Sequence, residues 1–323
     1  MCRVSNEPQS GTDLRSNQIA RIRSLLCPGT FSFRIVSAAV FGSAAVGRAT
    51  RHSDIDLLVA SADLPHQRHR RSALIAEIKR SLPGVPLDVL LLTPAEVESN
   101  FTNHNPLFLD IAEDALVLVD SDGALQQAME RTRRYVRERG IVRTATGWRF
   151  PVVAGAPTLL SNVSNRDFAQ AMLDDAGRDR QIGDVPRDDG FYDKAVYHYQ
   201  QAVEKAVKAI LIAVGVFEKT HFVGTLLRKV TQENPAVPDA WRSRLQRTAA
   251  ISEELEPDVS LSRYPGIIQN QLWLPRSEYS AGRAREAAAL AQEALDSATA
   301  FVQDWFTPKR GPDVPEGPAE DEE

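Results

Sequence analysis

Two aspartates inside a strand-like run are the feature that most constrains how this sequence can fold. Asp54 and Asp56 belong to the run Asp-Ile-Asp-Leu-Leu-Val-Ala at residues 54–60, which otherwise has the apolar character of a buried strand. Side chains two positions apart on a strand point to the same face, so the two carboxylates are expected to lie together. Burying unpaired carboxylates costs several kcal/mol each, and a cation between them would offset that cost.

A glycine and a serine precede these aspartates. Gly42 and Ser43 close the strand-like run 33–42, and ten residues separate Ser43 from Asp54. A turn there is expected to open a helix, where glycine allows close backbone approach and free N–H groups can receive a phosphate. Since Mg²⁺ prefers oxygen ligands and usually binds a few carboxylates together with substrate phosphates, the pattern outlines a nucleoside triphosphate site.

The first half of the chain alternates between the strand and helix periods. Strands are predicted at 33–42, 54–60, 86–92 and 115–120, and helices at 13–26, 66–81 and 122–140. Thr93 and Pro94, after the third strand, are a typical helix start. We therefore predict an α+β N-terminal domain, residues 1–140, in which helices accompany a small mixed sheet.

The second half is different, because strand patterns are absent from it. Helices are predicted at 165–177, 191–215, 222–233, 239–253 and 277–306, and the longest apolar stripe is Tyr192, Val196, Tyr199, Val203, Ala206 and Ile210. The preceding stretch, 141–162, is rich in Thr, Gly, Pro and Ser and is interpreted as a junction. We predict an all-α helical bundle at 163–307 and a disordered acidic tail at 308–323.

The order Gly-Ser, ten residues, Asp-x-Asp resembles the signature of the DNA polymerase β-like nucleotidyltransferase superfamily, in the form seen in its minimal members. The resemblance covers roughly residues 30–120 and implies a third acid on a neighbouring strand, for which Asp88 is placed. It implies two bound Mg²⁺ ions that clamp the attacking and leaving oxygens at the α-phosphate, with Asp88 helping to deprotonate the attacking hydroxyl. The residues implied in catalysis and metal binding are Asp54, Asp56 and Asp88, and those implied in nucleotide binding are Gly42 and Ser43.

The helical half resembles the HEPN family (higher eukaryotes and prokaryotes nucleotide-binding). The resemblance spans roughly residues 163–307. It rests on Gln-Gln-Ala-x-Glu-Lys-Ala at 200–206, on the Thr-His of segment 219–230, and on Tyr264-Pro265. The order of transferase and then HEPN bundle strengthens both assignments, because the two families frequently occur together.

Without the resemblance, the long helix is an amphipathic core helix with Gln200, Glu204 and Lys205 as its polar rim. Many HEPN proteins are metal-independent RNases that carry an Arg, four to six residues, and then a His. None of the six histidines here has an Arg five to seven positions before it, so the usual groups for RNA cleavage are missing. A nuclease is therefore not expected, and His198 and His221 are expected to be structural.

The predicted activity is a Mg²⁺-dependent nucleotidyl transfer that moves a nucleoside monophosphate, with AMP from ATP as the expected case, onto a hydroxyl of a protein or small molecule. In the resembling toxin–antitoxin pairs the transferase adenylylates its HEPN partner. Because both halves share one chain here, self-modification at a tyrosine such as Tyr264 is a further hypothesis. Two alternatives are an aminoglycoside-type small-molecule nucleotidyltransferase and a non-catalytic nucleotide-binding regulatory or interaction module.

Net charge, apolar runs and cysteine content limit the classes of partner that this chain is expected to bind. The net charge is −5, of which the tail 308–323 contributes −4, so the body lacks the basic balance of a protein that grips nucleic acid. There is no apolar run of membrane-spanning length and no signal-peptide pattern, and Cys2 and Cys27 form no disulfide framework or metal-ligand spacing. We expect a cytoplasmic protein with no membrane partner, and a homodimer through the helical bundle is consistent with the HEPN resemblance.

Overall fold

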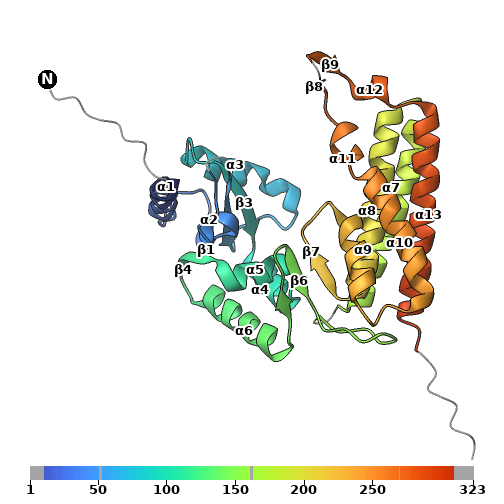
Figure 1. The fold of residues 1–323 in the computed structure, drawn as a ribbon. Coiled ribbons are helices and arrows are strands. Elements are labelled where there is room, and N and C mark those ends of the chain that lie inside the picture. Colours follow the sequence, from blue (N-terminus) through green and yellow to red (C-terminus); the bar gives the residue numbers. More distant parts are fainter. Residues whose placement is uncertain (1–10, 51–52, 161–162, 269, 309–323) are drawn as a thin grey trace, which may run out of the picture. The chain divides into compact units, whose positions relative to one another are not determined.

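The structure, a computed structural model, describes residues 11–50, 53–160, 163–268 and 270–308. The chain divides into two compact units, residues 1–140 and 141–323, which are described separately (Figure 1). Among the described residues, no helix is long and apolar enough to cross a membrane. The predicted acidic tail lies outside the described residues except for Pro308.

The N-terminal unit is built on a four-stranded sheet in the order β3-β2-β1-β4. The strands are β1 (Ile35–Phe41), β2 (Ile55–Ser61), β3 (Leu87–Leu92) and β4 (Leu116–Asp120). β2 and β3 are parallel, whereas β1 is antiparallel to both of its neighbours. All four strands fall where the sequence predicts them, and the sheet is mixed as expected.

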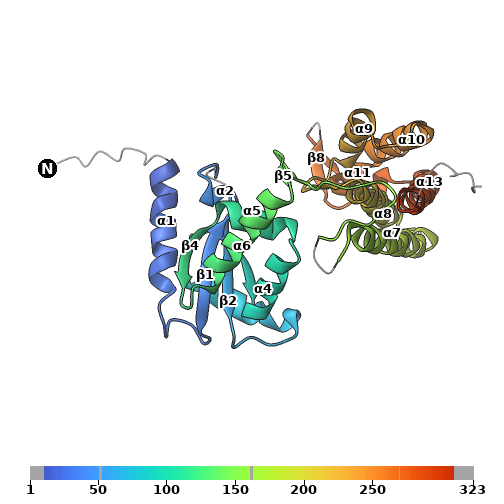
Figure 2. The same cartoon turned by 90° about the horizontal axis from the view of Figure 1, so that it is seen from below.

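Helices cover both faces of this sheet (Figure 2). They are α1 (Gly11–Leu25), α2 (Gly42–Ala45), the 3₁₀ turn η1 (Arg68–Arg71), α3 (Ser72–Ser81), α4 (Pro94–Thr102), α5 (Pro106–Asp114) and α6 (Ala124–Glu138). α1 and α3 pack on one face through residues such as Ile22 and Ile78. α4, α5 and α6 pack on the other through Phe101, Phe108 and Met129. Because both faces are buried, the central strands are apolar runs rather than alternating patterns.

A buried arginine fixes the end of the edge strand β3. The side chain of Arg71 is 2% exposed and forms an ion pair with Glu96, with 2.6 Å between Nη1 and Oε2. Its guanidinium also donates to the carbonyl oxygen of Leu91 at 3.2 Å and to that of Pro65 at 2.9 Å. One side chain therefore joins the segment after β2, the end of β3 and the first turn of α4, through charge-assisted hydrogen bonds.

The C-terminal unit is a helical bundle with two small sheets. Its helices are α7 (Asn165–Asp188), α8 (Tyr192–Ala213), α9 (Val223–Glu233), α10 (Asp239–Leu255), α11 (Asp258–Leu261), α12 (Pro275–Glu278) and α13 (Ala281–Trp305). Its strands are β5 (Val142–Arg143), β6 (Gly147–Arg149), β7 (Val216–Glu218), β8 (Gly266–Ile268) and β9 (Gln271–Trp273). β5, β6 and β7 form one antiparallel sheet, and β8 and β9 form a hairpin.

Helix α8 is the core of the bundle, with α7 and α13 packed along it (Figure 1). Five residues of the predicted stripe are at most 1% exposed: Val196, Tyr199, Val203, Ala206 and Ile210. Tyr192, in the first turn, is half-buried. The helix period of the sequence therefore identifies the buried face of this unit correctly.

Three features of this unit differ from the sequence prediction. The predicted all-α region 163–307 contains β7 and the β8–β9 hairpin, because strands of three residues have no detectable period. α7 continues past the predicted end at residue 177, because its later turns pack against α8. Gly183 makes this packing possible, since an added methyl group there would lie 2.6 Å from Tyr199 Cε1. Glycine and proline usually interrupt helices, so Gly183 and Pro186 argue against a continuous helix when only the sequence is considered. The predicted junction 141–162 also contributes β5 and β6, since strands of two or three residues have no detectable period.

The Arg71–Glu96 pair predicts an acid-sensitive N-terminal unit. Burial alone would raise the pKa of Glu96, but hydrogen bonds from Arg71, the Thr93 N–H and Arg68 outweigh it and lower the pKa to about 2. A carboxyl with a depressed pKa contributes stability that is complete above its unfolded pKa and is lost as pH falls toward the folded value. The urea concentration at the midpoint of unfolding of this unit should therefore decrease as the pH is lowered from about 5 to about 2.

The variant Glu96→Gln tests this assignment. We expect it to lower the free energy of unfolding at pH 7 by about 1–3 kcal/mol, because Arg71 loses its charged partner, and to flatten the acid dependence. Glu98→Gln is the matched control, since Glu98 pairs with Arg131 at the surface, where both side chains are more than half exposed. An equal effect of both substitutions would contradict the assignment.

The close packing of α7 on α8 predicts a second stability effect. Gly183→Ala should destabilise the C-terminal unit by about 1–3 kcal/mol, because the methyl group overlaps a buried ring. Gly177→Ala, on the same helix with no atom within 4 Å of the added methyl group, should be neutral or stabilising by up to about 1 kcal/mol. Thermal unfolding of the two variants distinguishes packing from helix propensity.

Candidate active site

The three predicted acids meet at one end of the N-terminal sheet because of its strand directions. β1 is antiparallel to β2, so Phe41 at the end of β1 pairs with Asp56 at the start of β2. β3 is parallel to β2, and Asp56 pairs in turn with Asp88. Asp54 comes one residue before β2, and Gly42 directly follows β1. The end of β1, the start of β2 and the start of β3 thus lie together at one end of the sheet.

Asp56 and Asp88 also share a face of the sheet. Each lies two residues before a leucine, Leu58 or Leu90, that packs in the core beneath α4, α5 and α6. Since side chains alternate along a strand, both carboxylates lie on that same face. Neighbouring strands are about 4.8 Å apart, a spacing that suits two carboxylates around a small cation.

The burial of the two aspartates differs from the sequence prediction. β2 begins at Ile55, so Asp54 lies outside the strand and is exposed, Asp56 is half-buried, and Asp88 is exposed on the edge strand. The expected desolvation cost is therefore much smaller than two fully buried carboxylates would carry. The strand end forms an open, acidic rim instead.

Gly42 approaches Asp56 more closely than any other residue type could. Its φ is +67°, a left-handed value that favours glycine. A methyl group at this position would lie 2.1 Å from Asp56 Oδ2. The glycine predicted from the Gly-Ser motif is therefore required both by the backbone conformation and by the carboxylate beside it.

The turn after Gly42 is a single helical turn rather than a longer helix. α2 ends at Ala45, and beyond it Gly47 has a φ of +69° and the Arg48 N–H donates to the Ser43 carbonyl oxygen at 2.9 Å, as in a Schellman motif. Ser43 is half-buried beside Gly42. This closure fixes the backbone of the Gly-Ser pair next to the acids.

The donor set suits a hard divalent cation. Three carboxylates and a serine hydroxyl offer only oxygen ligands, which Mg²⁺ prefers. Within the described part of the chain, no three His, Cys, Asp or Glu side chains are already gathered closely enough to hold an ion. The residue types and their placement fit Mg²⁺ that binds together with a phosphate-bearing substrate.

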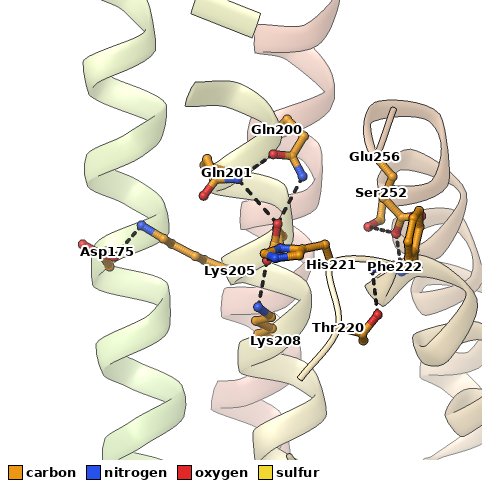
Figure 3. Close-up of polar contacts among 12 residues, drawn as sticks. Asp175, Gln200, Gln201, Lys205, Lys208, Thr220, His221, Phe222, Ser252 and Glu256 are labelled. Atoms are coloured by element: carbon orange, nitrogen blue, oxygen red, sulfur yellow. Dashed lines mark hydrogen bonds and ion pairs between the residues drawn. The ribbon is translucent and has the colours of Figure 1, made fainter. Parts of the chain in front are cut away.

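A second polar cluster lies in the C-terminal unit, where the sequence predicted only a polar rim (Figure 3). Gln200 and Glu204 are 2% and 5% exposed, so this prediction is wrong for both. The Glu204 carboxylate accepts from Lys208 Nζ at 2.7 Å and from His221 Nδ1 at 3.0 Å through Oε1. Gln200 Nε2 donates to Oε2 at 3.3 Å. Lys205, which stays at the rim, pairs with Asp175 on α7.

Glu204 is ionised in this cluster. Burial alone would raise its pKa, but the hydrogen bond and charge of Lys208, with hydrogen bonds from Gln200 and His221, lower it below its ordinary value. The partner His221 lies 17 residues away, in the turn before α9. The signal in the sequence that could have indicated a buried polar cluster is the Gln-Gln-x-x-Glu group. It lies among small and apolar residues of the helix, and Ala202, Val203 and Ala206 are all buried.

Comparison with known proteins matches a different domain family to each of the two units. A nucleotidyltransferase domain model matches residues 29–119, and a HEPN domain model matches residues 169–303. "Putative toxin MJ1304" of Methanocaldococcus jannaschii is 32% identical over 142 residues, which are 44% of this chain and 93% of the relative. "Putative protein adenylyltransferase MJ1305" of the same organism is 27% identical over 114 residues, 34% of this chain and 76% of the relative. Among solved structures, the archaeal HEPN homologue ST0689 is 25% identical with a TM-score of 0.31, covering 42% of this chain and 97% of that one.

Fold, site and matched domain model together define an enzyme of the nucleotidyltransferase class. The chain carries a nucleotidyltransferase domain in its N-terminal unit and a HEPN domain in its C-terminal unit, as the two matched domain models show.

Gly42→Ala tests the geometry of the site. Both Gly42→Ala and Gly47→Ala place alanine at a positive φ, which costs about 1–2 kcal/mol. Only Gly42→Ala also collides with Asp56, whereas the methyl group at Gly47 has no atom within 4 Å. We expect similar backbone strain in both variants, and loss of Mg-nucleotide binding, measured by titration calorimetry, in Gly42→Ala alone. Unchanged binding in Gly42→Ala would show that Asp56 need not stay in place.

Proposed function

We propose that this protein transfers a nucleoside monophosphate, AMP from ATP, to a hydroxyl group on a protein or small molecule, with Mg²⁺ as the metal. The observation that supports it most directly is the register that pairs Asp56 with Asp88, while Gly42 lies against Asp56. Acids for metal and acceptor therefore stand beside a glycine-serine turn suited to a triphosphate.

Each residue has a distinct role in this proposal. Asp54 and Asp56 hold the two metal ions, and Asp88 completes the set and takes the proton of the acceptor hydroxyl. Ser43 donates its hydroxyl to the triphosphate, and Gly42 leaves room for the phosphates at the backbone. Bound Mg²⁺ would supply neutralisation of the charge that develops on the phosphate oxygens. The protein's own contribution is positioning and electrostatic stabilisation.

A role in toxin–antitoxin regulation is part of the proposal. The two relatives are named as a toxin and as a protein adenylyltransferase, each prefixed as putative. Both functions would be joined here in one polypeptide. The names of the two relatives favour a protein as the acceptor. If the helical bundles pair, the pairing would bring the transferase of one copy near the bundle of another.

Transfer of label from NTP tests the proposal. Purified full-length protein is incubated with each α-labelled NTP and Mg²⁺, alone and with cell extract, and then analysed by denaturing gel and chromatography. We expect labelled product with the native protein and at least a 100-fold loss in Asp54→Ala/Asp56→Ala, because the paired carboxylates stabilise the transition-state charge.

Glu130→Gln is the control, since Glu130 is an exposed carboxylate on α6 of the same unit. It should transfer label as the native protein does. Equal labelling by the double variant would contradict the assignment of the acids. Intact Mg-NTP binding without any labelled product would favour the non-catalytic binding module.

A further inference from the structure

His221 carries an imidazole whose two ring nitrogens are in different environments. Nδ1 lies 3.0 Å from Glu204 Oε1, whereas the side chain as a whole is 72% exposed. Glu204, by contrast, has a side chain only 6% exposed. One ring nitrogen is therefore anchored by a buried group (Figure 3), while most of the side chain is accessible to solvent.

The anchor determines where the ring proton sits. An ionised carboxylate can only accept, so Nδ1 must carry the hydrogen, and in the neutral ring Nε2 then bears the lone pair. Lys208 at 2.7 Å and Gln200 at 3.3 Å hold the same carboxylate in place. The result is an exposed nitrogen nucleophile whose tautomer is fixed, which is the arrangement used to activate imidazoles in proteins.

Three other candidate nucleophiles of this unit, Tyr199, Tyr279 and His198, are less available. The hydroxyl of Tyr199 donates to Asp184 at 2.8 Å and that of Tyr279 to Asp258 at 2.6 Å. Burial, followed by these hydrogen bonds, raises the pKa of both phenols. His198 is similarly bonded to Asp179, at 3.2 Å, but its side chain is only 28% exposed.

We propose that His221 Nε2 is an acceptor of the nucleotidyl group, so that the HEPN unit carries a nucleotide in P–N linkage. This inference rests on the proposed transfer activity and names an acceptor for it beyond the hydroxyl class. The nucleotide can come from the transferase domain of the same chain or of a second copy.

The transfer balances as a simple displacement. The Nε2 lone pair attacks the α-phosphorus, an Nε2–P bond forms, and the bond from that phosphorus to the bridging oxygen breaks. Pyrophosphate leaves with the electron pair. The ring becomes cationic, Glu204 balances that charge, and loss of the Nδ1 proton to water gives a phosphoramidate in which the imidazole ring is neutral and the phosphoryl group keeps one negative charge.

Linkage chemistry provides the test. Full-length protein is labelled with each α-labelled NTP and Mg²⁺, and the protein-bound label is then exposed to mild acid or to alkali, because P–N bonds to histidine are lost in acid and kept in alkali. We expect acid-labile label that falls at least 10-fold in His221→Asn. In Glu204→Gln, where the anchoring charge is removed, we expect a fall of about 10-fold.

His198→Asn is the matched control, a second carboxylate-bonded histidine of the same bundle, and should label as the native protein does. Mg-ATP binding should be unchanged in His221→Asn, which shows that the transferase unit is intact, and an unchanged thermal unfolding midpoint shows that the helical bundle is folded.

Three results would overturn the proposal. Acid-stable label that persists in His221→Asn would identify a hydroxyl acceptor, such as the 60% exposed Tyr264, and leave the transferase function intact. Labelled small molecules from cell extract without labelled protein would do the same. Absence of both label and Mg-NTP binding in the native protein would overturn the transferase function as well.

Discussion

The antiparallel pairing of β1 with β2, extended by the parallel pairing of β2 with β3, is the constraint on which the transferase site depends. It brings the end of one strand beside the starts of two others, so that Phe41, Asp56 and Asp88 stand in one row across the sheet. β3 is an edge strand with only β2 as its neighbour. Arg71 therefore matters beyond its own ion pair, because it ties the far end of β3 to the segment that follows β2.

The C-terminal unit depends on a different kind of interaction, a charge buried within a helical core. Leaving Glu204 unpaired there would cost several kcal/mol. Its donors come from the same helix and from the turn before α9, so the turn adds to the contacts that offset the cost. Satisfied polar networks of this kind favour one arrangement of a core over its alternatives. The turn that carries His221 is thus held by the buried side of the bundle.

Much of this architecture could be predicted from the sequence, and the reasons are physical. The long buried strands are continuous apolar runs, and the stripe of α8 has a strong helix period. Gly42 and Asp56 could be recognised because a positive φ restricts the first to glycine and the second shares a strand face with Asp88. Short strands such as β5 and β6 have no period, and α7 passes through Gly183, whose role depends on the distant ring of Tyr199. The contact of Glu204 with His221 joins residues 17 positions apart, and only the folded chain brings them together.

The position of the metal ions tests the central claim most directly. Crystals of the full-length protein grown with MnCl₂ and a non-hydrolysable ATP analogue would be measured at the manganese absorption edge. The account predicts anomalous peaks among the carboxylates of Asp54, Asp56 and Asp88, with the triphosphate running toward Gly42 and Ser43. A nucleotide bound elsewhere, or manganese bound away from these three side chains, would contradict it.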